Sequence, residues 1–339
     1  MSFLVIGNKL DALILSDYLY EHGWPVNIMS KSNFEYRGDS ELASIKDLDK
    51  LGLDYKNHIL TEIHKMRVID YFGKSYEKPT NTILLNLSKL SNDLYFKLKK
   101  NCKIFTDTTY IDKNNENIFI QQGVHGTLLK AKHVFAVNDM NLANNLKTKK
   151  CIRASFELKQ EKSILTLKFL DSGYLWYVNY SDKVGELCIV SDTPEKDLES
   201  FILDTGAKII YRKGILLPYY KPERPLQNKG VFLSGDSAFT NNNLNFYNFI
   251  PKLEFMQLTC KFAHDLMTKK NISYPFFTRD YDKILEKYFN RGEVFWSLSK
   301  DQRNKLIQKM SFEDFALDFN SAFEKSSILS IPKLKLLFK

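Results

Sequence analysis

The stretch that decides the fold is Phe3-Leu4-Val5-Ile6-Gly7-Asn8-Lys9-Leu10-Asp11-Ala12, at the beginning of a 339-residue chain. Its first four residues form a continuous apolar run, which is typical of a strand buried on both faces of a parallel sheet. Gly7 and Asn8 end the run, with Asn8 a candidate N-cap for a helix over residues 10–22. A second strand is predicted at residues 25–29. This order predicts the βαβ unit that opens a dinucleotide-binding domain.

Residues 30–150 predict a mixture of helices and short strands. Helices are expected at residues 40–52 and 84–100, with a hairpin of residues 67–77 between them. Strands are expected at residues 103–107, 117–121, 127–130 and 133–137, the last of them buried.

The later part of the chain contains two kinds of element. Residues 152–217 carry longer alternating runs, which predict an antiparallel sheet. A buried strand at residues 231–234 then leads into Gly235-Asp236, and a helix is expected at residues 251–267. From Tyr281 onward the chain is predicted to be helical and amphipathic.

This order of elements resembles the FAD-dependent oxidoreductases of the aromatic-hydroxylase superfamily. Within that superfamily the chain is most similar to the geranylgeranyl reductases. Gly173-Tyr174-Leu175-Trp176-Tyr177-Val178 resembles the Tyr-x-Trp-x-Phe motif of that family's substrate sheet, and Gly214-Ile215-Leu216-Leu217-Pro218 resembles the strand before its late Gly-Asp motif. The segments Tyr281–Leu285 and Phe295–Ser299 are similar to the family's C-terminus.

The resemblance implies an α/β fold: a Rossmann-like (FAD/NAD(P)-binding) parallel-sheet domain, an inserted antiparallel substrate sheet and a helical C-terminus. The Rossmann-like domain is expected to be discontinuous, with residues 1–66, 81–150 and 228–270. The substrate domain is expected to comprise residues 67–80 and 151–227, and the C-terminal helical region residues 271–339.

The resemblance also implies where FAD would be held. The diphosphate would lie at the N-terminus of the helix that begins near Lys9, where backbone N–H groups and the helix dipole favour an anion. The implied cofactor-binding residues are Gly7, Asn8, Lys9, Leu10, Ser30, Lys31, Gly235, Asp236 and Ser237. Tyr174 and Trp176 would wall an apolar substrate tunnel, although ordinary sheet packing also explains such a pair.

Three segments depart from the family pattern. Lys9 stands where the second glycine of G-x-G-x-x-G allows close approach of the backbone to the diphosphate. Ser30-Lys31 replaces the acid expected at the end of the second strand, and the asparagine-rich residues 239–248 replace a glycine cluster. The chain has only 14 glycines, whereas average usage would give about 24.

Three functions remain open from the sequence. The first is an FAD-dependent oxidoreductase that reduces C=C bonds of an apolar, isoprenoid-like substrate. The second is a non-catalytic relative that has lost FAD and acts as a binding or scaffold protein, and the third is a flavoprotein with different chemistry, such as hydroxylation. No catalytic residue is assigned, because the cofactor itself carries out most of flavin chemistry.

Charge and cysteine usage argue against two further classes, nucleic-acid-binding proteins and metalloproteins. The net charge of +9 comes from 41 Lys and 8 Arg scattered along the chain, which argues against a nucleic-acid-binding surface. The cysteines Cys102, Cys151, Cys188 and Cys260 form no CxxC pair, and no metal site is expected. We expect a cytoplasmic protein, in which the basic, apolar residues 331–339 provide peripheral membrane contact or a packed terminal helix. The oligomeric state is left open.

Overall fold

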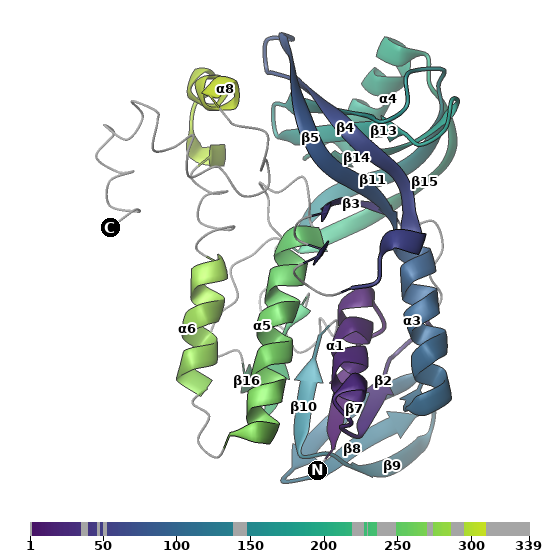
Figure 1. The fold of residues 1–339 in the computed structure, drawn as a ribbon, viewed down its shortest axis with the longest axis vertical. Coiled ribbons are helices and arrows are strands. Elements are labelled where there is room, and N and C mark those ends of the chain that lie inside the picture. The colour runs from purple at the N-terminus through teal and green to yellow at the C-terminus, as the bar shows by residue number, and fades with distance from the viewer. Residues whose placement is uncertain are drawn as a thin grey trace.

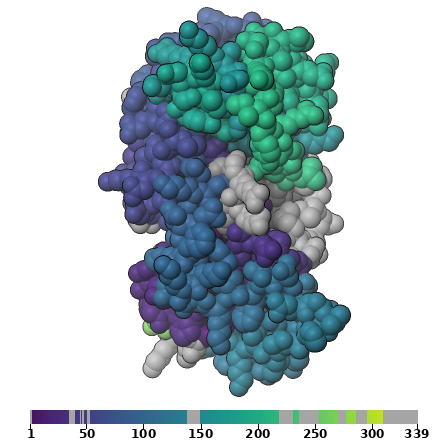
Figure 2. All heavy atoms as spheres, turned by 90° about the vertical axis from the view of Figure 1, so that its right-hand side faces the viewer, coloured from purple at the N-terminus to yellow at the C-terminus, as the bar shows by residue number. Residues whose placement is uncertain are grey.

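The computed structural model describes residues 2–34, 40–45, 48–49, 53–137, 148–218, 227–228, 230–235, 249–269, 274–285 and 295–309. Two halves lie along the long axis of the molecule (Figure 1). Figure 2 shows residues of the 150–218 region in the upper half, and purple and blue residues from the first 130 in the lower half.

The lower half is built on a mostly parallel sheet, sheet A. Its strand order is β16-β17-β10-β1-β2-β6. The strands are β1 (Phe3–Ile6), β2 (Val26–Met29), β6 (Lys103–Phe105), β10 (His133–Ala136), β17 (Val231–Leu233) and the antiparallel β16 (Gln227–Asn228). Every residue of β1 is buried, as the apolar run predicts for a central strand covered on both faces.

Helices cover one face of sheet A and a small sheet covers the other (Figure 1). The helices are α1 (Leu10–Glu21), α3 (Leu87–Asn101) and α5 (Phe249–Thr268), with α6 (Tyr274–Leu285) packed on α5. Sheet C consists of β7 (Thr108–Asn114), β8 (Asn117–Gln122) and β9 (His125–Lys130). Ile118 and Ile120 of β8 pack into the core of sheet A, so the lower half has three layers.

The upper half contains the eight-stranded sheet B, with the order β15-β11-β14-β13-β12-β4-β5-β3. Its strands are β3 (Ser40–Ser44), β4 (Ile59–Ile69), β5 (Ser75–Asn86), β11 (Thr148–Glu157), β12 (Ile164–Leu170), β13 (Gly173–Asn179), β14 (Val184–Val190) and β15 (Lys208–Pro218). The 3-10 helix η1 (Lys56–His58) precedes β4. Helix α4 (Pro194–Thr205) packs on one face of sheet B, and α8 (Lys300–Lys309) contributes to the core on the other.

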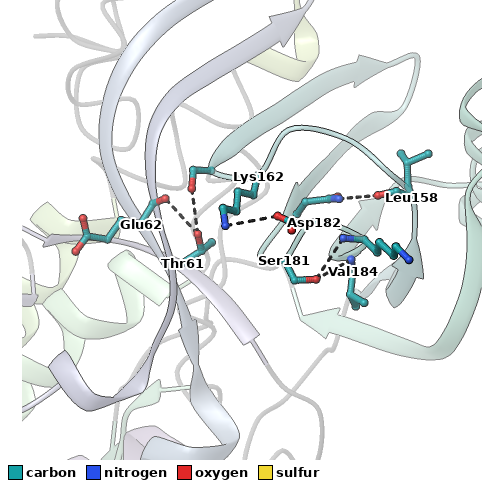
Figure 3. A network of polar contacts seen from close by, with 10 residues as sticks. Thr61, Glu62, Leu158, Lys162, Ser181, Asp182 and Val184 are labelled. Atoms are coloured by element: carbon teal, nitrogen blue, oxygen red, sulfur yellow. Dashed lines mark hydrogen bonds and ion pairs between the residues drawn. The ribbon is translucent and has the colours of Figure 1, made fainter.

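Strands β4 and β12 pair in parallel, whereas the other pairs in sheet B are antiparallel. The pairing joins the early hairpin to the later meander, and polar contacts surround it (Figure 3). The Thr61 and Ser163 hydroxyls lie 3.3 Å apart, and Lys162 Nζ lies 3.5 Å from an Asp182 carboxylate oxygen. The Thr61–Ser163 contact links two stretches of chain about a hundred residues apart in sequence, whereas the Lys162–Asp182 pair lies within the later stretch.

The structure confirms the predicted βαβ unit and the mixed α/β architecture, and it corrects several elements. Residues 40–44 form strand β3, although residues 45, 48 and 49 are helical as expected. The short apolar run at residues 103–105 belongs to sheet A, and the first strand of the small sheet is β7. In both places long-range strand pairing overrides the local pattern, which cannot report the partner of a short strand.

The hairpin before α3 is longer than the 67–77 segment predicted. Strands β4 and β5 together span residues 59–86, and β3 pairs with β5 at the edge of sheet B. Residues 40–66 and 81–86 were expected in the Rossmann-like domain, but their strands lie in sheet B. Helix α3 accordingly begins at Leu87, three residues later than predicted, because Ile83–Leu85 belong to β5.

Candidate cofactor and substrate site

The loop between β1 and α1 keeps the shape of an anion-binding turn. Gly7 has φ of 148°, a value that favours glycine, and its amide donates to the Met29 carbonyl at 2.8 Å. Lys9 occupies the N-cap position, and among the described residues no side chain caps the N-terminus of α1. The first-turn amides of an uncapped helix suit a phosphate group.

Asn8 has a different role from the N-cap that the sequence suggested. Its side-chain amide donates to the Ser32 hydroxyl at 2.7 Å and to the Asn33 carbonyl at 3.4 Å. Asn8 therefore ties the glycine turn to the loop that follows β2. The N-cap position itself falls one residue later, at Lys9, because the helix begins at Leu10.

The loop after β2 satisfies its own polar groups. The buried Ser30 hydroxyl donates to the Ser32 carbonyl at 2.7 Å and accepts from the Ser32 amide at 3.2 Å. Lys31 is exposed. At the two positions where an acid would bind ribose hydroxyls, this chain therefore has an engaged hydroxyl and a positive charge.

Gly235 marks where β17, β10 and α1 meet. Its φ is 54°, and a Cβ there would lie 2.7 Å from the Val137 carbonyl oxygen and 2.9 Å from Asp11 Oδ2. Backbone and helix therefore approach too closely for any other residue. The structure brings Gly235 to the same end of sheet A as Gly7 and the N-terminus of α1, as the sequence predicts. Asp236 and Ser237 lie outside the described residues.

A lysine from sheet B lies within electrostatic reach of Lys9, the N-cap residue of α1. Lys213 of β15 is half-buried, and burial together with the nearby charge of Lys9 lowers its pKa. Lys9 itself is exposed and does not fill the turn. Two ammonium groups in electrostatic reach of each other repel, so an anion between them would be stabilised by both.

The inner face of sheet B, defined as the face opposite α4, carries three rows of side chains across β11, β14, β13 and β12. The rows are Cys151, Val190, Tyr174, Phe169; Arg153, Cys188, Trp176, Leu167; and Ser155, Glu186, Val178, Leu165. Polar groups gather on β11 and β14, whereas β12 and β13 contribute mainly apolar ones. The face therefore has a polar half beside β15 and an apolar half beyond it.

An ion pair crosses the polar half. Arg153 donates to Glu41 Oε2 of β3 and to the Ser40 carbonyl, the latter at 2.5 Å. The side chains of Arg153 and Glu41 are 13% and 8% exposed, so water screens their charges little. Since β11 lies beside one edge of sheet B and β3 forms the other, this pair shows that the sheet curls until its two ends meet.

A second carboxyl group lies beside this pair. Glu186 is buried, and it accepts a hydrogen bond from the Ser155 hydroxyl at 2.7 Å. Burial raises the pKa of Glu186, and the Ser155 hydrogen bond and the Arg153 charge only partly offset that effect. The side chain therefore tends to hold a proton where an ordinary carboxyl would have lost it.

This proton has a measurable consequence for stability. Since the folded-state pKa of Glu186 is raised, its contribution is fully present below the unfolded pKa and is lost as pH rises through the folded pKa. We expect Glu186→Gln to be less stable than the wild type at about pH 4 and equally or more stable at about pH 8. Urea unfolding at several pH values measures this crossover, and parallel curves for the two proteins would contradict it.

Tyr174 and Trp176 lie in the apolar half of the inner face, 2% and 1% exposed. They pack with residues of β4, β12 and the C-terminal helical segments, including Phe295, Leu306 and Ile307. The Arg153 guanidinium lies 5.2 Å from the centre of the Trp176 ring, so this residue joins the two halves. The structure brings the predicted aromatic pair to the inner face, and its lining of a tunnel stays a prediction.

A cavity of about 640 Å³ lies elsewhere, between α1 and α5. Tyr18, Asp17, Cys260, Lys261 and His264 are among its lining residues, and none of the predicted site residues is. Within the described ranges no cluster of three or more His, Cys, Asp or Glu side chains suits a metal ion. No helix in the described part of the chain is long and apolar enough to cross a bilayer.

The architecture matches that of known flavoenzymes. A geranylgeranyl bacteriochlorophyll reductase-like protein from Thermoplasma acidophilum is similar, with a TM-score of 0.80 and 14% identity over 99% of this chain and 98% of its own. The chain has the fold of FAD-dependent oxidoreductases. The recognition of this fold from the sequence motifs is therefore confirmed.

Two further structures with this fold carry other chemistry. A flavoprotein/dehydrogenase from Cytophaga hutchinsonii has a TM-score of 0.71 and 11% identity, over 99% of this chain and 96% of its own. The myxobacterial chondrochloren halogenase, described as FAD-dependent, has a TM-score of 0.65 and 11% identity, over 99% and 88%. No family model and no curated protein sequence matches the chain. Identities this low establish the fold alone.

The described residues fit the diphosphate part of FAD better than its adenosine end. The start of α1, where the Lys9 side chain makes no capping hydrogen bond, the conformation of Gly7 and the charges of Lys9 and Lys213 together suit an anion. At the ribose end, Ser30 is engaged in its own loop and Lys31 has the wrong charge for binding a diol. Residues 35–39 and 236–248, which include the asparagine-rich segment, lie outside the described part.

Sequence reasoning missed Arg153, Glu41, Glu186 and Lys213 as members of the site. One signal was present: Arg153, Ser155 and Glu186 share the face of β11 and β14 that carries Cys151, Cys188 and Val190. A charged residue at an inward strand position indicates either a partner or a ligand. The partner of Arg153 comes from a strand over a hundred residues earlier, which the pattern could not show.

Proposed function

We propose that the chain binds FAD and reduces C=C bonds of an apolar, isoprenoid-like substrate. The observation that carries the proposal is the conformation of the turn before α1, where Gly7 has a positive φ and Lys9 is the N-cap. Lys213, which pairs with Arg153 in the polar half of sheet B, lies within electrostatic reach of Lys9. An anionic cofactor held there would extend from the N-terminus of α1 toward the inner face. Bound FAD would supply the reducing equivalents of the reaction.

The chain's own residues would bind and orient the two reactants. Lys9, Lys213 and the first turn of α1 would bind the diphosphate by charge and by backbone N–H groups. Tyr174 and Trp176, with the apolar residues around them, would bind hydrocarbon and exclude water. Glu186, whose raised pKa favours the protonated form, is placed to hold a proton on the same face.

The similarity to the geranylgeranyl bacteriochlorophyll reductase-like protein from Thermoplasma acidophilum supports the choice of substrate class. The basic, apolar residues 331–339 would favour peripheral contact with an anionic membrane, where such lipids are dissolved. Nucleic acid is not proposed as a partner, since the basic residues form no stripe along the sequence.

A second candidate is a non-catalytic relative that binds an apolar ligand without FAD. The engaged Ser30 hydroxyl and the charge of Lys31 favour it, because a diol-binding carboxylate is absent from both positions. This candidate would bind the same apolar ligand but would not reduce its C=C bonds.

A turnover assay under anaerobic conditions distinguishes the FAD-dependent reductase from the non-catalytic relative. The protein is incubated with FAD, dithionite and geranylgeranyl-chain lipid in detergent, and the lipid is examined by mass spectrometry. We expect a product heavier by two hydrogens for each reduced bond, and loss of that product in Trp176→Ala. Trp24→Ala, in the half of the molecule built on sheet A, is the control. Bound but unreduced lipid, in a protein that retains no FAD, would favour the non-catalytic candidate.

A further inference from the structure

Two cysteines of the inner face lie next to each other. The sulfur atoms of Cys151 on β11 and Cys188 on β14 are 3.7 Å apart, and both thiols are free. The strand register pairs Arg153 with Cys188 and Cys151 with Val190, so the two cysteines occupy diagonal positions on one face. A right-handed twist shortens one diagonal between neighbouring strands, which explains how the sulfur atoms come into contact.

The two sulfur atoms are in van der Waals contact. Two bonded sulfur atoms lie about 2.05 Å apart, so the sulfurs need to approach by roughly 1.7 Å. Rotation about the side-chain bonds of two adjacent strands can provide an approach of this size, since both side chains already point to the same face. Neither thiol is ligated to a metal or enclosed by a third cysteine among the described residues.

The surroundings give the two thiols different roles. Hydrogen bonding from Cys188 lowers the pKa of Cys151, and the charge of the adjacent Arg153 guanidinium lowers it further, against the opposing effect of burial. The same hydrogen bond, together with burial, raises the pKa of Cys188. Cys151 is therefore the better nucleophile, and Cys188 is the thiol that keeps its proton.

The other two cysteines lack these features. Cys260 is buried in α5, where burial raises its pKa. Cys102 is half-buried at the end of α3, where burial and the charge of Asp17 raise its pKa. Neither has another cysteine in contact in the described part of the chain, so both serve as internal controls.

We propose that Cys151 and Cys188 form a redox-active dithiol, which a peroxide converts into a disulfide between β11 and β14. In the first step the Cys151 thiolate attacks one oxygen of hydrogen peroxide, forming the sulfenic acid and releasing hydroxide. In the second, the Cys188 sulfur displaces the sulfenic hydroxyl, which leaves as water with the Cys188 proton. Two thiols are oxidised, one peroxide is reduced, and a dithiol reductant reverses the change.

The disulfide would form on the inner face of sheet B, next to residues of the proposed site. Cys188 is the direct neighbour of both Arg153 and Trp176 in the strand register, and Cys151 shares a row with Tyr174. A bond between them would fix β11 to β14 at the boundary between the polar and the apolar half.

Titration of the wild-type protein with hydrogen peroxide tests the inference without any variant. Intact mass should fall by two hydrogens, non-reducing peptide mapping should link Cys151 to Cys188, and dithiothreitol should restore both thiols. Oxidation of this pair should be at least about tenfold faster than that of Cys260, which is likewise buried but has no neighbouring thiol. A pair that stays reduced while Cys102 is oxidised would overturn the inference, as would a disulfide that involves Cys102 or Cys260.

Variants assign the two roles. In Cys188→Ser, peroxide should leave Cys151 as a sulfenic acid that a dimedone probe labels, whereas Cys151→Ser should leave Cys188 unlabelled. Cys260→Ser should form the disulfide at the wild-type rate. Dimedone labelling of Cys188 rather than Cys151 would overturn the assigned order of steps.

Discussion

Replacing Arg153 with alanine is expected to lower the free energy of unfolding by about 3–5 kcal/mol, the largest effect of any single change considered for this chain. The substitution removes the cation between Glu41 and Glu186, two carboxyl groups that are each 8% exposed or less. The carboxylate of Glu41 would then be buried without its counter-ion. Chemical denaturation at neutral pH measures the loss.

A double variant separates the effect of charge from that of lost packing. Arg153→Met combined with Glu41→Leu replaces the ion pair with apolar groups of similar volume, and buried pairs tolerate this kind of exchange. We expect the double variant to regain most of the stability lost in Arg153→Ala. If Arg153→Ala loses less than about 1 kcal/mol, a typical value for an exposed pair, the ion pair does not hold the ends of sheet B together.

Reversing the two charges at the N-terminus of α1 is expected to weaken FAD binding about a hundredfold. Lys9→Glu and Lys213→Glu each replace an attraction to the diphosphate with a repulsion, and each should cost at least about 1.4 kcal/mol, or tenfold in affinity. Both residues border the same turn, so their effects need not add and the double variant is measured as well. Flavin fluorescence quenching and calorimetry give the dissociation constants.

Lys208→Glu is the matched control for these variants. Lys208 lies on β15 as Lys213 does, but its side chain is 80% exposed and within 3.9 Å of Glu157. Lys208→Glu changes the net charge by the same amount as each of the other two substitutions. Because salt screens an exposed charge, this variant should leave FAD affinity within about twofold of the wild type at physiological salt. An equal loss in all three variants would indicate a long-range charge effect and would contradict a diphosphate site at Lys9.

The sequence was sufficient for the opening βαβ unit and for one end of the site. The apolar run of β1, Gly7 and the helix beginning at Leu10 specify a βαβ unit through local pattern, and the structure has that unit. The resemblance to the family's late Gly-Asp motif implied Gly235 at this site, and the structure places Gly235 beside Val137 and Asp11.

The sequence was insufficient for the elements and contacts that depend on pairing between strands far apart in the chain. Strand β3 resembles the start of a helix locally, and only its pairing with β5 makes it a strand. The contact between Glu41 and Arg153 depends on the curl of sheet B, and the contact between Cys151 and Cys188 depends on register. Neither curl nor register follows from the alternation of apolar residues in a single strand.

The glycine deficit that raised doubt about the cofactor has a partial explanation in the structure. Lys9 is exposed rather than packed into the turn, so its side chain leaves the backbone amides of α1 accessible. At the end of β2 the departure remains, because Ser30 binds within its own loop. The account therefore predicts FAD binding that relies on the diphosphate more than on the adenosine ribose.

The flavin content of the purified protein tests the central claim most directly. The chain is expressed, purified and examined for visible flavin absorbance, and the FAD released on denaturation is quantified per chain. Protein that loses cofactor during purification is titrated with FAD. The account predicts saturable binding of one FAD per chain, weakened by Lys9→Glu and Lys213→Glu. A folded protein that is colourless and takes up no added FAD would contradict it.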